Sequence, residues 1–277
     1  KVRKVKVQAD FAGQRLDNFL MRELKGLPRS MIYRLIRRGE VRVNGGRAKP
    51  ERKLQAQDEV RVPPVRVAKE APMPTTPSRL AEVLRNAVLY EDRDVLVLDK
   101  PAGLAVHGGS GERQGVIEML RQIRPEGASL ELVHRLDKAT SGCLLVAKRR
   151  PALRALHEAL REGGVGKHYT ALVRGEWPAA RQHVKAPLTR NVLRSGERVV
   201  TVDEDGKFAL TEVRARVANA TASLLQVRLH TGRTHQIRVH AAFAGHPLAG
   251  DDKYGDPQFN KMMAALGLKR MFLHASR

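Results

Sequence analysis

A proline-rich segment divides this chain into two parts. Residues 63–77, PPVRVAKEAPMPTTP, contain five prolines. Proline fixes φ and lacks a backbone N–H, so this segment does not form a regular helix or a central strand. Such a composition is typical of an extended tether between folded units. We therefore expect one domain over residues 1–66, a linker over residues 67–79 and a second domain over residues 80–277.

Positive charge is concentrated in the first of these domains. The chain has 51 Lys+Arg and 29 Asp+Glu, which gives a formal net charge of +22. Residues 1–66 hold 18 of the basic and 7 of the acidic residues, and 18 − 7 = +11 is half of the excess. A basic module of this kind usually binds phosphate backbones, whereas a solvated or membrane-facing patch is the alternative. We expect a nucleic acid as the partner.

The apolar spacing in the basic domain predicts two helices and a small sheet. Leucine and phenylalanine recur at helical intervals over residues 16–24, and a second helix is expected from Ser30 to Arg38, with Gly39 as its stop. Residues 41–43 and 59–62 have the character of short strands. Arginines remain on the outer side of the second helix, and a purely structural role leaves them unexplained.

Short β-branched segments and a few helices make up the second domain. Because regular crossover helices do not separate the strands, we predict an α+β fold built on a largely antiparallel sheet. The expected strands are residues 95–98, 143–147, 170–173, 222–229 and 234–240, and the expected helices are residues 115–123 and 151–162.

The sequence also excludes several classes of protein. The single cysteine, Cys143, allows neither an intramolecular disulfide nor a thiolate metal cage. No GxxxxGK[ST] loop or GxGxxG fingerprint is present, so we expect no nucleotide cofactor. We expect no metal site, because there is no HExxH motif and because His235 and His240 would point to opposite faces of a strand. The absence of a long apolar run favours a soluble, cytoplasmic protein without a membrane partner.

One segment has the residues for chemistry. VHRLDKATSG, residues 133–142, stands directly before the apolar segment CLLVA. At such a junction of loop and strand, the carboxylate of Asp137 is poised to enter a cleft. The alternative, which turn chemistry alone favours, is a turn whose Asp, Thr and Ser side chains bond the local backbone.

The basic domain resembles a known RNA-binding module. RLDNFLMRELKGLPRSMIYRLIRRGEVRVNG is similar to the αL-type module of a small-subunit ribosomal protein and of tyrosyl-tRNA synthetases, over about sixty residues. The resemblance implies that the second helix and the loop after it grip RNA. Such contacts set affinity and register more than base identity. The residues expected to make them are Arg29, Arg34, Arg37, Arg38 and Arg42.

HRLDKATSG resembles the catalytic signature of the RluA-type pseudouridine synthases. Three further segments agree with that family in the same order, EDRDVLVLDKPAGLAVHGG, KHYTALVRG and HTGRTHQIRVHAAFAGHPLAGDDKYG, across about 175 residues. The resemblance implies that the bond from uracil N1 to ribose C1′ is broken and that C5 of the rotated base is joined to the same sugar carbon. The reaction consumes nothing, so no cofactor is expected.

The resemblance assigns three catalytic residues. Asp137 matches the family's carboxylate, which can attack the sugar, take its 2′ proton or stabilise developing positive charge, and the sequence leaves these three roles open. Arg238 matches the partner arginine, a cation that keeps a carboxylate ionised in a desolvated cleft, and an arginine on an exposed strand face is the alternative. Tyr169 matches the tyrosine that stacks on the target base, and a buried structural tyrosine is the alternative.

RNA contacts are expected around these three residues. The target uridine must leave its stack, which costs less if a side chain fills the gap. We expect Arg135, beside Asp137, to be that wedge. His107 with the two glycines after it, Arg233 and His240 are further candidates for contacts to RNA or to the motif loops.

The basic domain, the PPVRV segment and VHGGSGERQGVIEMLRQIRPE are most similar to the branch of the family that modifies 23S rRNA. This implies modification of several uridines in 23S rRNA or a pre-50S particle, by a protein that we take to be a monomer. The same chemistry on tRNA or at another rRNA site is one alternative, and a non-catalytic RNA-binding or ribosome-assembly protein is another. The chain starts at Lys, and the family continues into another strand after MFLHASR, so we expect a longer gene product.

Overall fold

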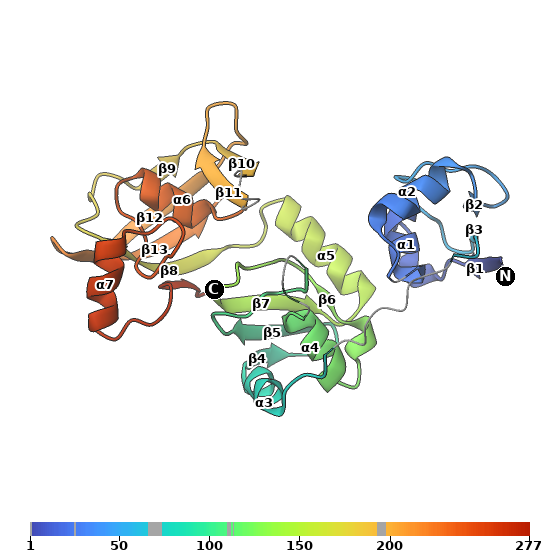
Figure 1. The fold of residues 1–277 in the computed structure, drawn as a ribbon, viewed down its shortest axis with the longest axis horizontal. Coiled ribbons are helices and arrows are strands. Elements are labelled where there is room, and N and C mark those ends of the chain that lie inside the picture. Colours follow the sequence, from blue (N-terminus) through green and yellow to red (C-terminus); the bar gives the residue numbers. More distant parts are fainter. Residues whose placement is uncertain (1, 25, 66–73, 110–111, 113, 193–197) are drawn as a thin grey trace. The chain divides into compact units, whose positions relative to one another are not determined.

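The chain divides into two compact units, residues 1–74 and 75–277. The computed structural model describes residues 2–24, 26–65, 74–109, 112, 114–192 and 198–277 (Figure 1). Residues 67–73 of the predicted linker lie outside the described residues. Helix α3 (Ser78–Asn86) begins two residues before the predicted second domain, and Pro77 is its N-cap. Proline is accepted there because the N-cap needs no backbone N–H for the helix.

The amino-terminal unit is a helix pair packed on a small sheet. Helices α1 (Leu16–Glu23) and α2 (Arg29–Arg37) confirm the predicted pair. Strands β1 (Arg3–Lys6), β3 (Glu59–Val62) and β2 (Arg42–Val43) form an antiparallel sheet in that order. Strand β1 was not predicted from the sequence, because most of its side chains are charged and exposed. The core includes Leu16, Phe19, Leu20, Ile32, Leu35, Ile36, Val43, Val60 and Val62.

A nine-stranded mixed sheet organises the second unit (Figure 1). Its order is β4-β5-β7-β14-β8-β13-β12-β9, with β6 also paired to β7. Every pair is antiparallel except β7 with β14, which confirms the predicted largely antiparallel sheet. The strands are β4 (Val88–Glu91), β5 (Val95–Lys100), β6 (Glu131–Leu132), β7 (Ser141–Ala147), β8 (His168–Arg174), β9 (His183–Lys185), β12 (Leu210–Ala218), β13 (Ala222–Leu229) and β14 (Leu273–Ala275). A separate hairpin consists of β10 (Leu188–Val192) and β11 (Arg198–Val202).

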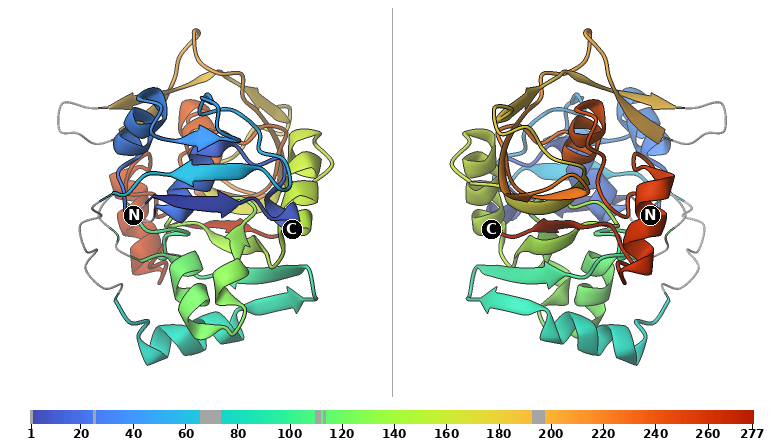
Figure 2. Two further views of the ribbon diagram at one scale, coloured as in Figure 1. Left: turned by 90° about the vertical axis from the view of Figure 1, so that its right-hand side faces the viewer. Right: turned by 90° about the vertical axis from the view of Figure 1, so that its left-hand side faces the viewer.

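Helices cover the two halves of this sheet separately. Helices α3 and α4 (Val116–Ile123) pack in one core with β5 and β7, while α5 (Arg150–Arg161) packs on the other face of β7. Helix α6 (Gln236–Phe243) belongs to the core of β8, β12 and β13, where Figure 2 shows it beside these strands. Helix α7 (Pro257–Ala265) contributes Phe259 and Met263 to a smaller cluster. The short strand β14 joins the two halves, so loops from both halves meet at its ends.

The predicted strand at residues 234–240 is wrong, because this segment enters helix α6. The β-branched residues Thr234, Ile237 and Val239, the last two at alternating positions, favoured a strand. Ile237 and Ala241 instead face the same core at helical spacing. Residues Gln236–Ala241 are all buried, so the polar stripe that normally marks a helix in a sequence is missing.

Candidate active site

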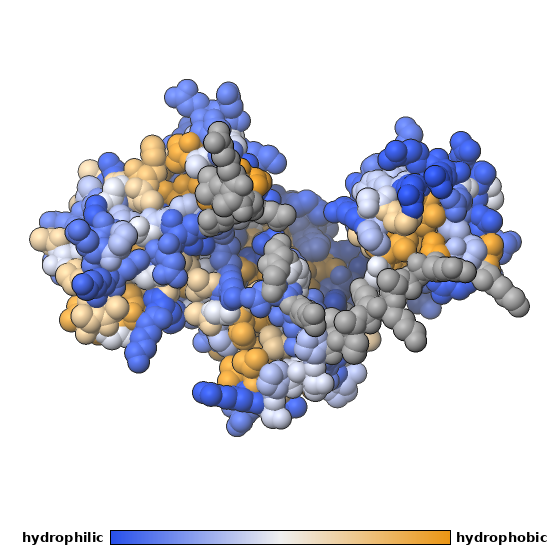
Figure 3. Space-filling model, in the orientation of Figure 1, coloured by the Kyte–Doolittle hydropathy of each residue, from blue (hydrophilic) through white to orange (hydrophobic). Residues whose placement is uncertain are grey.

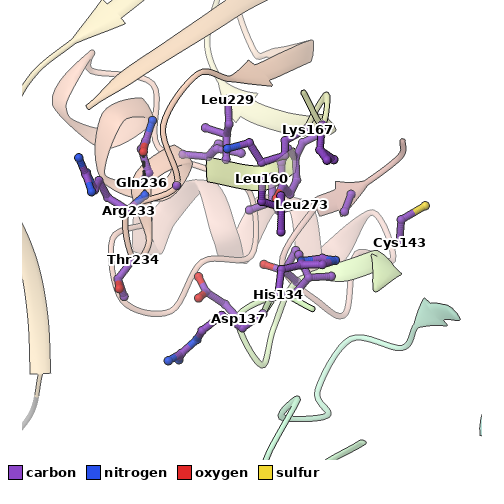
Figure 4. Close-up of a pocket in the computed structure, with 18 of the residues that line it drawn as sticks. His134, Asp137, Cys143, Leu160, Lys167, Leu229, Arg233, Thr234, Gln236 and Leu273 are labelled. Carbon is purple, nitrogen blue, oxygen red and sulfur yellow. Dashed lines mark hydrogen bonds between the residues drawn. The ribbon is translucent and has the colours of Figure 1, made fainter. Parts of the chain in front are cut away.

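A cavity of about 480 Å³ opens where the two halves of the sheet meet. Segments far apart in the sequence line it, namely the loop before β7, the first residues of β8, the end of β13 and the start of α6. Figure 4 shows Asp137 on one side and Thr234 and Gln236 across from it. The polar and charged lining includes Arg135, Asp137, Lys167, Tyr169, Arg190, Arg233, His235 and Arg238.

Asp137 stands in a tight turn directly before β7. The N–H of Thr140 donates to the Asp137 carbonyl at 3.1 Å, and the Leu136 side chain anchors the turn in the core. Gly142 has φ +111, and a Cβ there would meet the Ala275 carbonyl oxygen at 2.2 Å, so glycine allows β14 to pair beside the turn. Among the described residues, no backbone N–H donates to the Asp137 carboxylate, which is 22% exposed in the cavity. The backbone forms the turn, and the Asp137 carboxylate enters the cavity instead of bonding the local backbone as the alternative supposed.

Two nitrogen atoms of α6 and its N-cap face this carboxylate. Arg238 Nη1 lies 3.5 Å from Asp137 Oδ2, and His235 Nε2 lies 3.8 Å from the same oxygen. Arg238 Nε and Nη2 each donate to Asp251 at 2.7 Å. Burial raises the pKa of Asp251, but the hydrogen bonds from Arg238 outweigh it and leave that pKa lowered. Arg238 is therefore a buried cation fixed by one carboxylate and directed toward another, and not an arginine on an exposed strand.

Tyr169 faces the cavity from β8. Its ring packs against both principal cores of the unit. Burial, with a smaller effect of the Asp137 charge, raises the pKa of Tyr169 to about 12, so the hydroxyl is neutral. In the described part of the chain, that hydroxyl has no hydrogen-bond partner and is not fully buried. A structural tyrosine normally bonds its hydroxyl, so this arrangement favours a ligand-facing role.

Lys100 is a site-supporting residue that the sequence did not single out. It is fully buried at the end of β5, and its Nζ donates to the carbonyls of Pro101 at 2.7 Å, Leu104 at 2.8 Å and Lys138 at 3.2 Å. Burial lowers the pKa of Lys100 to about 8, and the negative charge of Asp137 opposes that shift. The three hydrogen bonds of Lys100 tie the loop after β5 to Lys138, the residue that follows Asp137. The feature of the sequence that could have pointed to Lys100 is its place in the segment LDKPAG, which agrees with the family. A lysine in a strand is usually exposed, however, so this position was not singled out.

Of the other residues predicted to contact RNA around the site, some line the cavity and some do not. Arg135 is exposed at the cavity, and Arg233 lines it while its Nε donates to the Phe208 carbonyl at 3.0 Å. His107 is exposed but does not line the cavity. His240 is wrong as a contact to RNA, because it is 1% exposed and bonds Thr211 at 2.8 Å and the Ala186 carbonyl at 2.9 Å.

The prediction that His235 and His240 point to opposite faces of a strand is also wrong. His235 is the N-cap of helix α6, and His240 lies in its last turn. Among the described residues, no three His, Cys, Asp or Glu side chains gather as metal ligands.

The sequence analysis did not single out Asp251 and Tyr254. Asp251 accepts hydrogen bonds from Arg238, and the Tyr254 hydroxyl lies beside His235 Nδ1. Both lie in the segment GDDKYG, whose resemblance to the family was noted without a role for either residue.

The predicted arginines of the amino-terminal unit mostly face solvent. Arg29, Arg34, Arg37 and Arg38 are exposed on α2 and its end, whereas Arg42 is half-buried and donates to the Gly39 carbonyl at 2.8 Å. Figure 3 shows hydrophilic residues over the part of this unit around α2 and the loop that follows it.

The sequence matches two protein families. Residues 94–243 match the RNA pseudouridylate synthase family, and residues 14–60 match the S4 domain. The chain therefore belongs to the RNA pseudouridylate synthase family and is an RNA pseudouridine synthase with an amino-terminal S4 domain. Within the described residues, every helix is too short or too polar to cross a bilayer.

Relatives extend over nearly the whole chain. Ribosomal large subunit pseudouridine synthase C of Salmonella typhimurium is 56% identical over 99% of this chain and 87% of the relative. The protein of the same name from Pasteurella multocida is 56% identical over 99% of this chain and 84% of the relative. Among solved structures, human RNA Pseudouridylate Synthase Domain Containing 1 is 29% identical with a TM-score of 0.57, covering 68% of this chain and 76% of that chain. Human RNA Pseudouridylate Synthase Domain Containing 4 is 25% identical with a TM-score of 0.57, covering 71% and 85%.

Proposed function

We propose that this chain isomerises uridine to pseudouridine in the 23S rRNA of the large ribosomal subunit, with Asp137 as the group that acts on the target nucleotide. The observation that carries the substrate is the 56% identity over 99% of the chain to proteins named for the large ribosomal subunit. In the reaction the N1–C1′ bond breaks and a C5–C1′ bond forms, while C5 loses a proton and N1 gains one. Atoms and electrons balance without a co-reactant. The proposed location of the reaction is the cytoplasm, where ribosomal RNA is assembled into ribosomes.

Asp137 is proposed as the catalytic carboxylate because of its surroundings. It is partly exposed in the cavity and lies 3.5 Å from a buried guanidinium. The guanidinium places a positive charge beside the carboxylate and leaves its oxygens open to the cavity. An ionised oxygen can attack C1′, accept the 2′ proton or stabilise positive charge at the sugar.

Tyr169 and Arg135 are proposed to hold the extruded nucleotide. A base that enters the cavity meets the neutral Tyr169 side chain, whose ring offers a stacking surface. Arg135 is exposed two residues from Asp137, where its side chain can fill the gap left in the RNA stack. Arg233 adds a positive charge at the same cavity for the phosphate backbone.

The S4 domain is proposed to supply affinity and register. Its exposed α2 arginines, Arg29, Arg34, Arg37 and Arg38, present positive charge without reading bases. Arg42 is assigned a smaller part, because its guanidinium already donates to a backbone carbonyl. His107 is retained as a contact from an exposed loop outside the cavity.

Chemical mapping of pseudouridine after reaction with defined RNAs tests this proposal. The protein is incubated with unmodified 23S rRNA, with pre-50S particles and with bulk tRNA, and Asp137→Asn is the matched control. We expect pseudouridine at discrete 23S positions, and none with the variant. Modification confined to tRNA would assign the same chemistry to a different substrate, and a native protein without product on any RNA would contradict the proposal.

A further inference from the structure

His235 has an unusual backbone at the edge of the cavity. It is the N-cap of α6 with φ 54 and ψ 20, the left-handed region. A residue other than Gly rarely adopts this conformation, and at a cavity it indicates a side chain held for a purpose. The His235 side chain is 19% exposed, and its Nε2 lies 3.8 Å from Asp137 Oδ2. The strained backbone thus places an imidazole nitrogen beside the proposed catalytic carboxylate.

Tyr254 fixes which nitrogen of His235 carries the proton. The Tyr254 hydroxyl accepts a hydrogen bond from the Val200 N–H at 3.0 Å and lies 2.8 Å from His235 Nδ1. Among the residues that the structure describes, this hydroxyl has no other acceptor within hydrogen-bond distance. Donation of its single proton to Nδ1 satisfies this hydroxyl and leaves the imidazole proton on Nε2, which faces Asp137.

The same tyrosine supports both groups that face Asp137. Its ring centroid lies 5.5 Å from that of His235 in an edge-on contact, and 5.0 Å from the Arg238 guanidinium carbon. Burial lowers the pKa of His235, so the imidazole is neutral. A neutral Nε2–H offers a hydrogen bond to Asp137 without adding a second positive charge next to Arg238.

We propose that His235 is a positioning residue for Asp137, whose Nε2–H, oriented by the Tyr254 hydroxyl, holds the carboxylate toward the target sugar when RNA is bound. This inference rests on the proposed role of Asp137. The separation of 3.8 Å exceeds a hydrogen bond and shortens in the RNA complex, as catalytic hydrogen bonds commonly do. Since Val200 belongs to β11, the hairpin β10–β11 is linked to Asp137 through two side chains.

A double-mutant cycle tests whether Tyr254 acts through His235. The variants are Tyr254→Phe, His235→Asn and the two together, since Asn accepts the left-handed backbone but lacks a donor at the Nε2 position. Single-turnover rates at saturating RNA, RNA dissociation constants and melting temperatures are measured for each. We expect each single variant to be about tenfold slower, the value of one hydrogen bond, with unchanged RNA affinity. The double variant should be no slower than His235→Asn.

The matched control is Tyr90→Phe, which removes a hydroxyl bonded to Asp92 at 3.0 Å on an exposed strand outside the cavity. It should retain the native rate. Losses that multiply to about a hundredfold in the double variant, or losses of affinity instead of rate, would overturn the coupling.

The tautomer is tested independently by imidazole ¹⁵N NMR of the native protein and Tyr254→Phe. We expect the Nε2–H form for His235 in the native protein and a mixture of tautomers in the variant. A native Nδ1–H form would overturn the inference. Full activity of Asp137→Asn would remove the catalytic role of Asp137 on which the inference rests, and absence of product from native protein would remove the proposed function itself. An inactive Asp137→Asn with fully active Tyr254→Phe and His235→Asn would remove only the role of His235.

Discussion

Arg238 Nη1 lies 3.5 Å from Asp137 Oδ2 although the other two guanidinium nitrogens are engaged elsewhere. Asp251 accepts from both of these at 2.7 Å and is itself fully buried. Asp251 thus fixes the position of the Arg238 guanidinium. Asp137 lies near this positive charge but does not form a bidentate pair with it. The carboxylate of Asp137 consequently stays free to interact with substrate.

Replacing Arg238 should affect stability and activity through different partners. Arg238→Ala leaves Asp251 buried and unpaired, which should cost about 3–5 kcal/mol of stability, and it should abolish turnover. Arg238→Met combined with Asp251→Leu removes both charges and should recover most of the melting temperature but no activity. Denaturant unfolding and single-turnover assays check this. An active double variant would contradict the electrostatic role of Arg238.

The ring of Tyr169 should matter more than its hydroxyl for holding the base. Tyr169→Phe keeps the stacking surface, whereas Tyr169→Leu loses the base–aromatic contact, which is worth about 1–3 kcal/mol. We expect Tyr169→Leu to be about ten- to a hundredfold less active than Tyr169→Phe in kcat/KM. Melting temperatures of both variants control for packing. Equal activities would show that the ring does not stack on the target.

Lys100 should make stability depend on pH. Its pKa is about 8 in the folded protein and 10.5 as the ordinary value. Between these values the unfolded chain binds the proton that the folded chain has released, so this group raises the free energy of unfolding as pH rises. Urea unfolding of the native protein and Lys100→Met from pH 7 to 10 isolates the effect. The stability of the native protein should increase relative to the variant, and a constant difference would contradict the lowered pKa.

Arginines of the S4 domain should control affinity and its salt dependence. Arg37→Ala with Arg38→Ala should weaken RNA binding and reduce the slope of log K against log salt by about 1–2. The rate at saturating RNA should stay unchanged. Arg93→Ala, an 85% exposed arginine of the other unit, is the matched control. Identical binding by native protein and double variant at several salt concentrations would disprove the RNA grip.

Much of the fold was predictable because local pattern and tertiary packing agree. Helices α1, α2 and α5 carry apolar residues at helical spacing, and the strands β5, β8 and β13 are rich in Val and Leu. Helix α6 was misjudged because it is buried on all sides, and β1 because its charged side chains hide a short strand.

The site was predictable only in part. Asp137, Tyr169 and Arg238 were located by their segments, and the structure brings them to one cavity. The tertiary supports could not be derived, because a lysine on three carbonyls or a histidine oriented by a tyrosine depends on contacts between distant segments. His240 shows the converse, since a histidine in the right segment is used for packing.

The central claim is that Asp137 drives the isomerisation, and tritium release from 23S rRNA labelled at uridine C5 tests it most directly. C5 loses its hydrogen only when it becomes bonded to ribose. Native protein should release tritium in proportion to the pseudouridine formed, and Asp137→Asn should fall below about a thousandth of that rate while binding RNA within a few-fold of native. Tritium release by Asp137→Asn at the native rate would contradict the account.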